Sequence, residues 1–287
     1  SITIPDSVTV IGTYAFENCT GLTSITIPDS VTVIKDGTFD GCTSLPVIDN
    51  IRYADTYLVE AVDKSLTTYS IKAGTRFIGD NSFNGCSSLA SITIPDSVTE
   101  IGYAAFASCR SLTSVTIPDS VTSIGNYAFY GCHSLTSVTI PNGVTSIGER
   151  AFYNCTSLTR VTIGNGVTEI GEEAFRYQVG LKHITIPESV TAIEYLAFSG
   201  TGLESIQVAE GNTIFDSRSN CNAIIETASN TLVVGCVKTT IPEGITTIAK
   251  GAFENTPNLT SIQLPKSVET ICMWAFRECR DLKEVNI

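Results

Sequence analysis

Residues 89–109 contain the pattern that decides the fold: Leu-Ala-Ser-Ile-Thr-Ile-Pro-Asp-Ser-Val-Thr-Glu-Ile-Gly-Tyr-Ala-Ala-Phe-Ala-Ser-Cys. With Ile92 taken as its start, the pattern returns along the whole chain of 287 residues. The spacing is 23 residues in nine of the twelve intervals. The starts are residues 2, 25, 48, 69, 92, 115, 138, 161, 184, 206, 239, 262 and 285.

Apolar residues occupy fixed columns of this repeat. Leu stands three residues before many starts, Ile nine after and Phe fourteen after, as in Leu89, Ile101 and Phe106. One unit is too small to bury these side chains alone. Stacking of equivalent units buries the columns together, which is the behaviour of solenoid proteins.

The order of residues within a unit predicts its shape. Apolar and polar residues alternate from Leu89 to Ile94, the period of a β-strand, and Pro95, which lacks an amide donor, closes that strand. Val98 and Ile101 belong to a second short extended piece. Ala15-Phe16-x-x-Cys19 has the spacing of one helical turn. We therefore expect a right-handed parallel solenoid of about twelve units, with short strands on its concave face and short helical turns on its convex face.

This repeat resembles the BspA-like (Treponema-type) leucine-rich repeat, and the resemblance covers almost the whole chain. It implies a leucine-rich-repeat superhelix. It also implies a bacterial surface or secreted protein that adheres to host proteins or to other cells. The family offers no catalytic residues that could be carried over to this sequence.

The domain organisation predicted from the repeat is a single domain over residues 1–287. The chain begins and ends inside the motif, so we expect a fragment of a longer protein. Two units depart from the pattern, at residues 48–68 and 206–238, and both contain strand–turn–strand sequences. Each is either a hairpin that projects between units or a loop that gives binding specificity.

The charge balance excludes several classes of function. A net charge of −12 argues against binding of nucleic acid or of anionic lipid, both of which need basic surfaces. The same charge favours a partner with a basic patch. No apolar stretch is long enough to cross a bilayer, so we expect no membrane insertion of these residues.

The spacing of the ten cysteines does not predict a framework of disulfide bonds. Seven of them share one column, 17 residues after a unit start, where side chains of neighbouring units point the same way and do not converge. We expect packed free thiols in this column. Cys221 and Cys236 face each other across a possible hairpin, and a disulfide between them stays open as an alternative.

Catalytic and metal-binding motifs are not found in the sequence, and we expect no cofactor. His133 and His183 lack a partner nearby in the sequence, so each is predicted to be a solvated side chain. A column of acidic residues follows the prolines and is interrupted by Asn142 and Asn165. Each unit offers only one carboxylate, whereas calcium needs several oxygen ligands. We therefore predict solvated turns and regard a calcium site as the less favoured alternative. The threonine ladder that begins at Thr3 predicts a polar strand face exposed to solvent. An ice-binding face is the less favoured alternative.

Candidate binding residues are those that break the monotony of the repeat. Arg160, His183 and Glu204 interrupt the Ser/Thr face of the first strands. Tyr127, Tyr130 and Tyr153 form a cluster that either binds a partner or packs over neighbouring units.

We expect an extracellular or cell-surface module without enzymatic activity. We expect the module to be a monomer and to bind a protein or glycan of the surface or matrix of a host or neighbouring cell. The alternative is a structural spacer or self-assembly repeat that holds another domain away from the cell.

Overall fold

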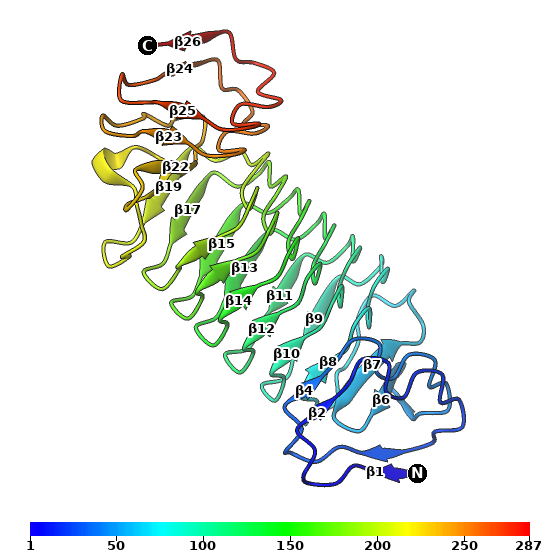
Figure 1. Ribbon diagram of the computed structural model, residues 1–287. Coiled ribbons are helices and arrows are strands. Elements are labelled where there is room, and N and C mark those ends of the chain that lie inside the picture. Colours follow the sequence, from blue (N-terminus) through cyan, green and yellow to red (C-terminus); the bar gives the residue numbers. More distant parts are fainter.

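The computed structural model describes residues 1–287, which form an elongated stack of about twelve chain turns (Figure 1). Each regular unit contributes two short strands and one outer turn. The chain has no α-helix, and its single 3-10 turn is η1 (Arg218–Asn220). The predicted solenoid is thus present as a β-solenoid.

The first strand row is built from the Ile-x-Ile segment of each unit. Its strands pair two by two, in parallel and with equivalent residues opposite each other, as in Val138↔Val161 and Thr139↔Thr162. The Ile residues point inward and the Thr residues outward, because successive side chains of a strand alternate between its faces. The row comprises β1 (Ile2–Thr3), β3 (Ile25–Thr26), β9 (Ser91–Thr93), β11 (Ser114–Thr116), β13 (Ser137–Ile140), β15 (Arg160–Ile163), β17 (His183–Ile186), β19 (Ser205–Val208), β24 (Ser261–Gln263) and β26 (Glu284–Asn286).

The second strand row is built from the Ile that stands nine residues after each regular start and the residue before it. These strands have only two residues each, and they also pair in parallel and in register, as in Ile124↔Ile147. They are β2 (Val10–Ile11), β4 (Val33–Ile34), β8 (Phe77–Ile78), β10 (Glu100–Ile101), β12 (Ser123–Ile124), β14 (Ser146–Ile147), β16 (Glu169–Ile170), β18 (Ala192–Ile193), β23 (Thr247–Ile248) and β25 (Thr270–Ile271).

The outer turns are not helical, which corrects the expectation of helical turns on the convex face. Each contains two residues with left-handed backbone, such as Tyr127 (φ 60°) and Gly131 (φ 69°). Alternate backbone N–H groups donate to the next unit: that of Tyr127 to the carbonyl oxygen of Glu149, and that of Phe129 to that of Ala151. The N–H of Ala128, between them, donates to the carbonyl oxygen of Gly125 within its own unit. A helix directs every N–H along its own axis, so the turns are instead part of the contacts between units.

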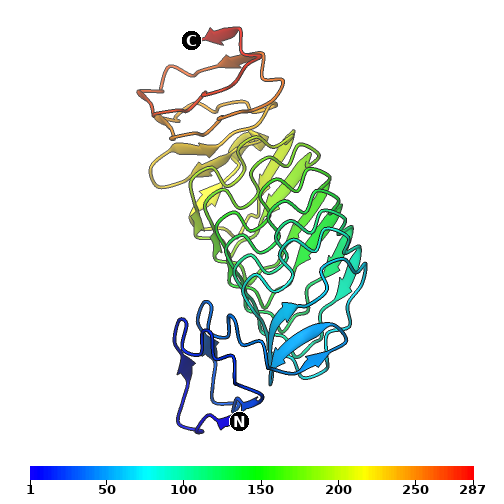
Figure 2. The same ribbon diagram turned by 90° about the vertical axis from the view of Figure 1, so that its right-hand side faces the viewer.

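The interior is filled by the predicted columns. The ring of Phe129 is fully buried and stacks between those of Phe106 and Phe152, with centroid distances of 5.2 and 5.1 Å. The buried apolar residues fall into three clusters, a large one of 50 residues and two of 14. We call the corresponding regular units the N-terminal block (residues 1–46), the central block (69–205) and the C-terminal block (239–287). Figure 2 shows the two terminal blocks standing off the line of the central block.

The first irregular unit lies between the N-terminal and central blocks. Its strands β5 (Val47–Ile48), β6 (Ile51–Ala54) and β7 (Tyr57–Ala61) pair antiparallel, and β7 then pairs in parallel with β8. The hairpin does not project, because Tyr53 and Leu58 on it are fully buried in the core. Side chains attach the N-terminal block: Arg76 donates to the carbonyl oxygen of Val31 at 2.8 Å, and Asp55 accepts from the N–H of Ile27 at 2.8 Å.

The second irregular unit repeats this arrangement between the central and C-terminal blocks. Strands β20 (Phe215–Asp216), β21 (Ile224–Glu226) and β22 (Thr231–Val234) pair antiparallel, and β22 pairs in parallel with β23. Its strands are also packed into the stack, since Ile225 and Leu232 are fully buried. Both irregular units therefore provide the first strands of the second row for the block that follows them.

All ten cysteines are free thiols in this structure. Cys221 and Cys236 belong to different core clusters, and the Cys236 thiol donates to the carbonyl oxygen of Asn222 at 3.2 Å. The hairpin that carries both residues is thus joined here by backbone pairing and by hydrogen bonds.

Candidate binding groove

The outer face of the first strand row is hollowed over the central block. Three hollows follow one another along the stack, and adjacent ones share lining residues. Thr162 and Asn165 line the first and second hollows, and Thr185 and Ala209 line the second and third. Together they form one continuous groove that crosses the strands from β11 to the second irregular unit.

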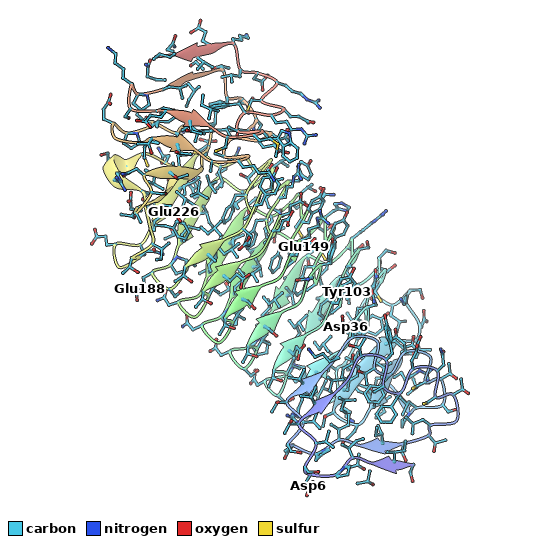
Figure 3. The ribbon with its side chains drawn as sticks, in the orientation of Figure 1. Asp6, Asp36, Tyr103, Glu149, Glu188 and Glu226 are labelled. Atoms are coloured by element: carbon cyan, nitrogen blue, oxygen red, sulfur yellow. The ribbon has the colours of Figure 1, made fainter.

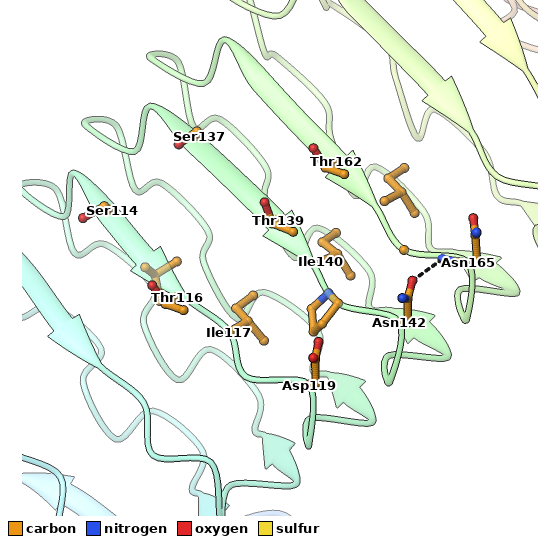
Figure 4. Close-up of a pocket in the computed structure, with 14 residues that line it drawn as sticks. Ser114, Thr116, Ile117, Asp119, Ser137, Thr139, Ile140, Asn142, Thr162 and Asn165 are labelled. Carbon is orange, nitrogen blue, oxygen red and sulfur yellow. Dashed lines mark hydrogen bonds between the residues drawn. The ribbon is translucent and has the colours of Figure 1, made fainter.

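The first part of the groove, the central hollow, has a volume of about 670 Å³. Its floor consists of hydroxyl side chains from successive strands, among them Ser137, Thr139 and Thr162. Its edge consists of the turns with Asp119, Asn142 and Asn165 (Figure 4). The Asn142 side-chain oxygen accepts a hydrogen bond from the N–H of Asn165 at 2.8 Å, which ties the two turns together.

The second part, the cationic hollow, has a volume of about 590 Å³ and brings together two of the predicted binding residues. Arg160 begins β15 and His183 begins β17, and both side chains are exposed. Neither takes part in a hydrogen bond or ion pair within the chain, and no carboxylate lines this hollow. The groove thus has an unpaired cation in its middle, in a protein of net charge −12.

The third part, the end hollow, is closed by the loop of the second irregular unit and has a volume of about 540 Å³. Asn212 holds this loop against the central block by donating to the carbonyl oxygens of Pro187 and Val190 at 2.9 and 2.8 Å. Arg218 donates to Asp216 at 2.8 Å. Despite partial burial of the carboxyl group, the hydrogen bonds from Arg218 and Thr227 hold the pKa of Asp216 below its ordinary value. The loop is therefore a fixed wall of the groove.

Glu204, the third predicted residue of this face, lies outside the groove. It precedes β19 by one position, so it does not share the column of Arg160 and His183. Its carboxylate pairs with Lys238 at 2.7 Å and Lys182 at 3.6 Å, and these contacts hold its pKa below the ordinary value. Glu204 is thus engaged by its own chain.

The predicted tyrosine cluster lies on the outer turns, on the side where Figure 3 labels Tyr103 and Glu149. Tyr130 and Tyr153 stack with ring centroids 5.0 Å apart, and Tyr127 contacts Tyr130 at 5.7 Å. The tyrosine rings therefore pack over neighbouring units, which is one of the two roles expected from the sequence. Arg150 lies over the Tyr127 ring at 5.5 Å and pairs with the buried Glu173. A binding role for the cluster stays a prediction.

The other candidate residues are placed apart from one another. His133 lies within 3.2 Å of the Asn154 amide, at the end of an outer turn. The acidic turn residues lie along one edge, where Figure 3 labels Asp6 and Glu188. No group of three or more His, Cys, Asp or Glu side chains is arranged to hold a metal ion. No helix in the chain could cross a membrane.

Comparison with known proteins agrees with this architecture. The profile described as "BspA type Leucine rich repeat region (6 copies)" matches residues 1–112, 99–226 and 233–287. The chain belongs to the BspA-type leucine-rich repeat family. The family predicted from the repeat pattern is thereby confirmed. A search of curated proteins found no match.

Several solved structures resemble this chain. A leucine-rich cell-surface protein from Faecalibacterium prausnitzii is 31% identical, with a TM-score of 0.64, over 100% of this chain and 69% of its own. A leucine-rich-repeat protein from Bacteroides ovatus is 25% identical, with a TM-score of 0.51, over 99% of this chain and 62% of its own. The pneumococcal vaccine antigen PcpA is 20% identical with a TM-score of 0.64, which shows the shared fold; the match covers 100% of this chain and 60% of PcpA.

Proposed function

We propose that this chain is a non-enzymatic binding module of a cell-surface or secreted protein, and that it holds a macromolecular partner in the groove of the central block. The likeness to a bacterial cell-surface protein supports this assignment and its extracellular location. A groove that crosses several units suits an extended protein or glycan segment, because solenoids present long continuous surfaces of this kind.

One observation carries the proposal: three columns of the repeat change together beside the groove. The column that holds Ser114 and Ser137 changes to Arg160 and then His183 in the next two units. The proline column changes to glycine at Gly164. The acidic turn column changes to asparagine at two successive units, ending with Asn165. The buried Phe column keeps its residue through these same units, so packing does not require the changes.

A screen with a blocked groove tests the proposal. Thr139→Tyr and Thr162→Tyr place bulky side chains over the central hollow at exposed positions, where the core is untouched. Ser157→Tyr, at an exposed position outside the groove, is the matched control. On an array of matrix proteins, cell-surface proteins and glycans, we expect the parent and the control to bind the same ligand and the double variant to lose it. Equal binding by all three would place the site elsewhere, with Tyr130 and Tyr153 as the next candidates.

The alternative is a spacer or self-assembly repeat. A spacer needs uniform units, and the varied residues along the groove favour the binding module. A parent protein that binds nothing on a broad array, together with a change of its sedimentation with concentration, would support self-assembly instead.

A further inference from the structure

We propose that the groove binds an acidic polysaccharide, a linear sugar chain that carries carboxylate or sulfate groups, with one acidic group seated between Arg160 and His183. This assignment rests on the proposed function and names the class of partner. It is argued from the charges and the hydrogen-bonding groups along the groove.

The cationic hollow provides the anion site. The Arg160 guanidinium has no partner in the chain, and guanidinium groups bind planar or tetrahedral oxyanions through paired N–H donors. The imidazole of His183 lines the same hollow and adds a hydrogen-bonding group one strand further along. An anionic group on a ligand would meet no carboxylate there.

The adjoining turns remove negative charge from the same place. Asp96 and Asp119 occupy the turn column in the two preceding units, and Glu188 occupies it in the next. Only in the two units between them is the residue a neutral amide, Asn142 and then Asn165. The Arg160 cation enters the strand column and carboxylates leave the turn column within the same part of the stack. Two independent columns thus change charge in the direction that attracts an anion.

The rest of the central hollow favours sugar over peptide. Its exposed floor is a lattice of hydroxyl groups, with Thr116, Thr139 and Thr162 on successive strands. Its edge carries two amides and, at the end away from Arg160, the single carboxylate of Asp119. Hydroxyl and amide groups both donate and accept hydrogen bonds, as sugar hydroxyls do. Apolar side chains are needed to anchor a peptide, and four of the fourteen lining residues are apolar. The strands are about 4.8 Å apart, so the polar groups recur at short regular steps along the groove.

Space for the chain comes from small residues at the edge. Gly164 lines the central hollow where most other units have proline. Gly166 packs against the preceding turn so closely that a Cβ atom there would lie 1.9 Å from the carbonyl oxygen of Asn142. The turns of these units therefore lie unusually close together and carry little side-chain bulk beside the groove.

The test compares four linear polymers. Polygalacturonate has a carboxylate on each sugar, its methyl ester has the same backbone without the charges, and polyglutamate has the charges without the sugar. Chondroitin sulfate is included to separate sulfate from carboxylate recognition. We expect the parent protein to bind polygalacturonate or chondroitin sulfate at least tenfold more tightly than the methyl ester and polyglutamate.

Variants that restore the residues of neighbouring units keep the fold intact. Arg160→Ser and His183→Ser reproduce Ser137, and Asn165→Asp reproduces Asp119. We expect each to weaken binding of the acidic polymer about tenfold or more, and Arg110→Ala, which removes an exposed cation outside the groove, to leave it within twofold. Binding should also weaken as salt is raised, because an exposed ion pair is screened.

Two results would overturn the assignment. One is equal binding of polygalacturonate by the parent and the three restoring variants. The other is equal binding of the acidic polymer and its methyl ester. If Thr139→Tyr with Thr162→Tyr still abolishes binding of some other ligand on the array, the groove remains the binding site and only the class of partner is wrong. If no ligand depends on the groove, the proposed function itself fails.

Discussion

The Cys132 thiol donates a hydrogen bond to the carbonyl oxygen of Phe106, 26 residues earlier and one unit down the stack, with an S–O distance of 3.2 Å. The same bond recurs from Cys109 to Phe83 and from Cys155 to Phe129. Each of these carbonyl groups also accepts a backbone hydrogen bond within its own unit, as that of Phe106 does from the N–H of Cys109 at 3.3 Å, so the thiol is its second donor. The cysteine column therefore joins neighbouring units by a polar contact in addition to its packing.

Loss of this donor should cost stability. Cys132→Ala removes one of the two donors to the Phe106 carbonyl group, which keeps its bond from the N–H of Cys109, and we expect it to lower the free energy of unfolding by about 0.5–1.5 kcal/mol. Cys132→Ser keeps a donor and should cost less. Urea unfolding followed by circular dichroism compares the two variants with the parent. An alanine variant as stable as the parent would show that the hydrogen bond contributes nothing net.

The thiols should differ sharply in reactivity. Burial raises the pKa of Cys155 to about 12 and that of Cys132 well above its ordinary value, and the thiolate is the reactive form. Cys19 and Cys272 are partly exposed. At pH 8 we expect iodoacetamide to modify these two in the native protein and all ten after denaturation, as read by mass spectrometry. Rapid native modification of Cys132 would contradict its burial.

The same thiols predict a loss of stability in alkali. Cys155 keeps its proton in the folded protein up to about pH 12, whereas in the unfolded chain it ionises near its ordinary value of 9.0. Its contribution is therefore fully present below pH 9 and is lost as the pH rises from there towards 12. We expect the urea midpoint of the parent protein to fall as the pH is raised from about 9 to about 11. With each protein compared with its own midpoint at pH 8, the fall should be smaller in Cys155→Ala.

The Phe column should dominate the stability of the central block. Phe129→Ala removes a fully buried ring that stacks on rings from both neighbouring units, and we expect a cost of about 3–5 kcal/mol. Chemical denaturation measures it. A loss below about 1 kcal/mol would mean that the neighbouring units close over the gap.

The junction to the C-terminal block should depend on Glu254. Its buried carboxylate accepts from Arg176 at 3.0 Å and from the Tyr195 hydroxyl at 3.3 Å, both in the central block. Glu254→Ala breaks this buried pair, and hydrogen exchange should then rise in residues 239–287 and stay unchanged near Phe129. Glu278→Ala, which breaks the exposed pair with Arg280, is the control. Uniform exchange along the chain would indicate that the two blocks do not separate.

The repeat alone was enough to predict the stack, the strand register and the buried columns, because apolar residues at fixed intervals leave few ways to bury them. It was not enough for the outer turns. The spacing of Phe16 and Cys19 is shared by a helical turn and by consecutive tight turns, and only the direction of the N–H groups separates them. The Asn or Gly before five of the seven column cysteines was a usable signal, since Asn18 and Gly131 both have left-handed backbone.

The candidate site was predicted in part. Arg160 and His183 were found because they break a Ser column, and the structure places both in one hollow. Glu204 lies in a different column and forms an ion pair with Lys238. Neither fact could be predicted from its difference from Ser and Thr in other units. The wall formed by Asn212 and Arg218 depends on how an irregular loop folds back over β19, and no periodic pattern encodes that.

The two antiparallel hairpins also bear on how the chain acquires its structure. Parallel pairing between units closes loops of about 23 residues, whereas Ile225 and Leu232 meet after a short turn. Short loops close at a smaller entropic cost and therefore faster. We expect each hairpin to act as a local nucleus on whose last strand the next units can add one at a time. As the chain emerges from the ribosome or crosses a membrane unfolded, residues 51–61 and 224–234 would order first, and structure would grow from them towards the C-terminus.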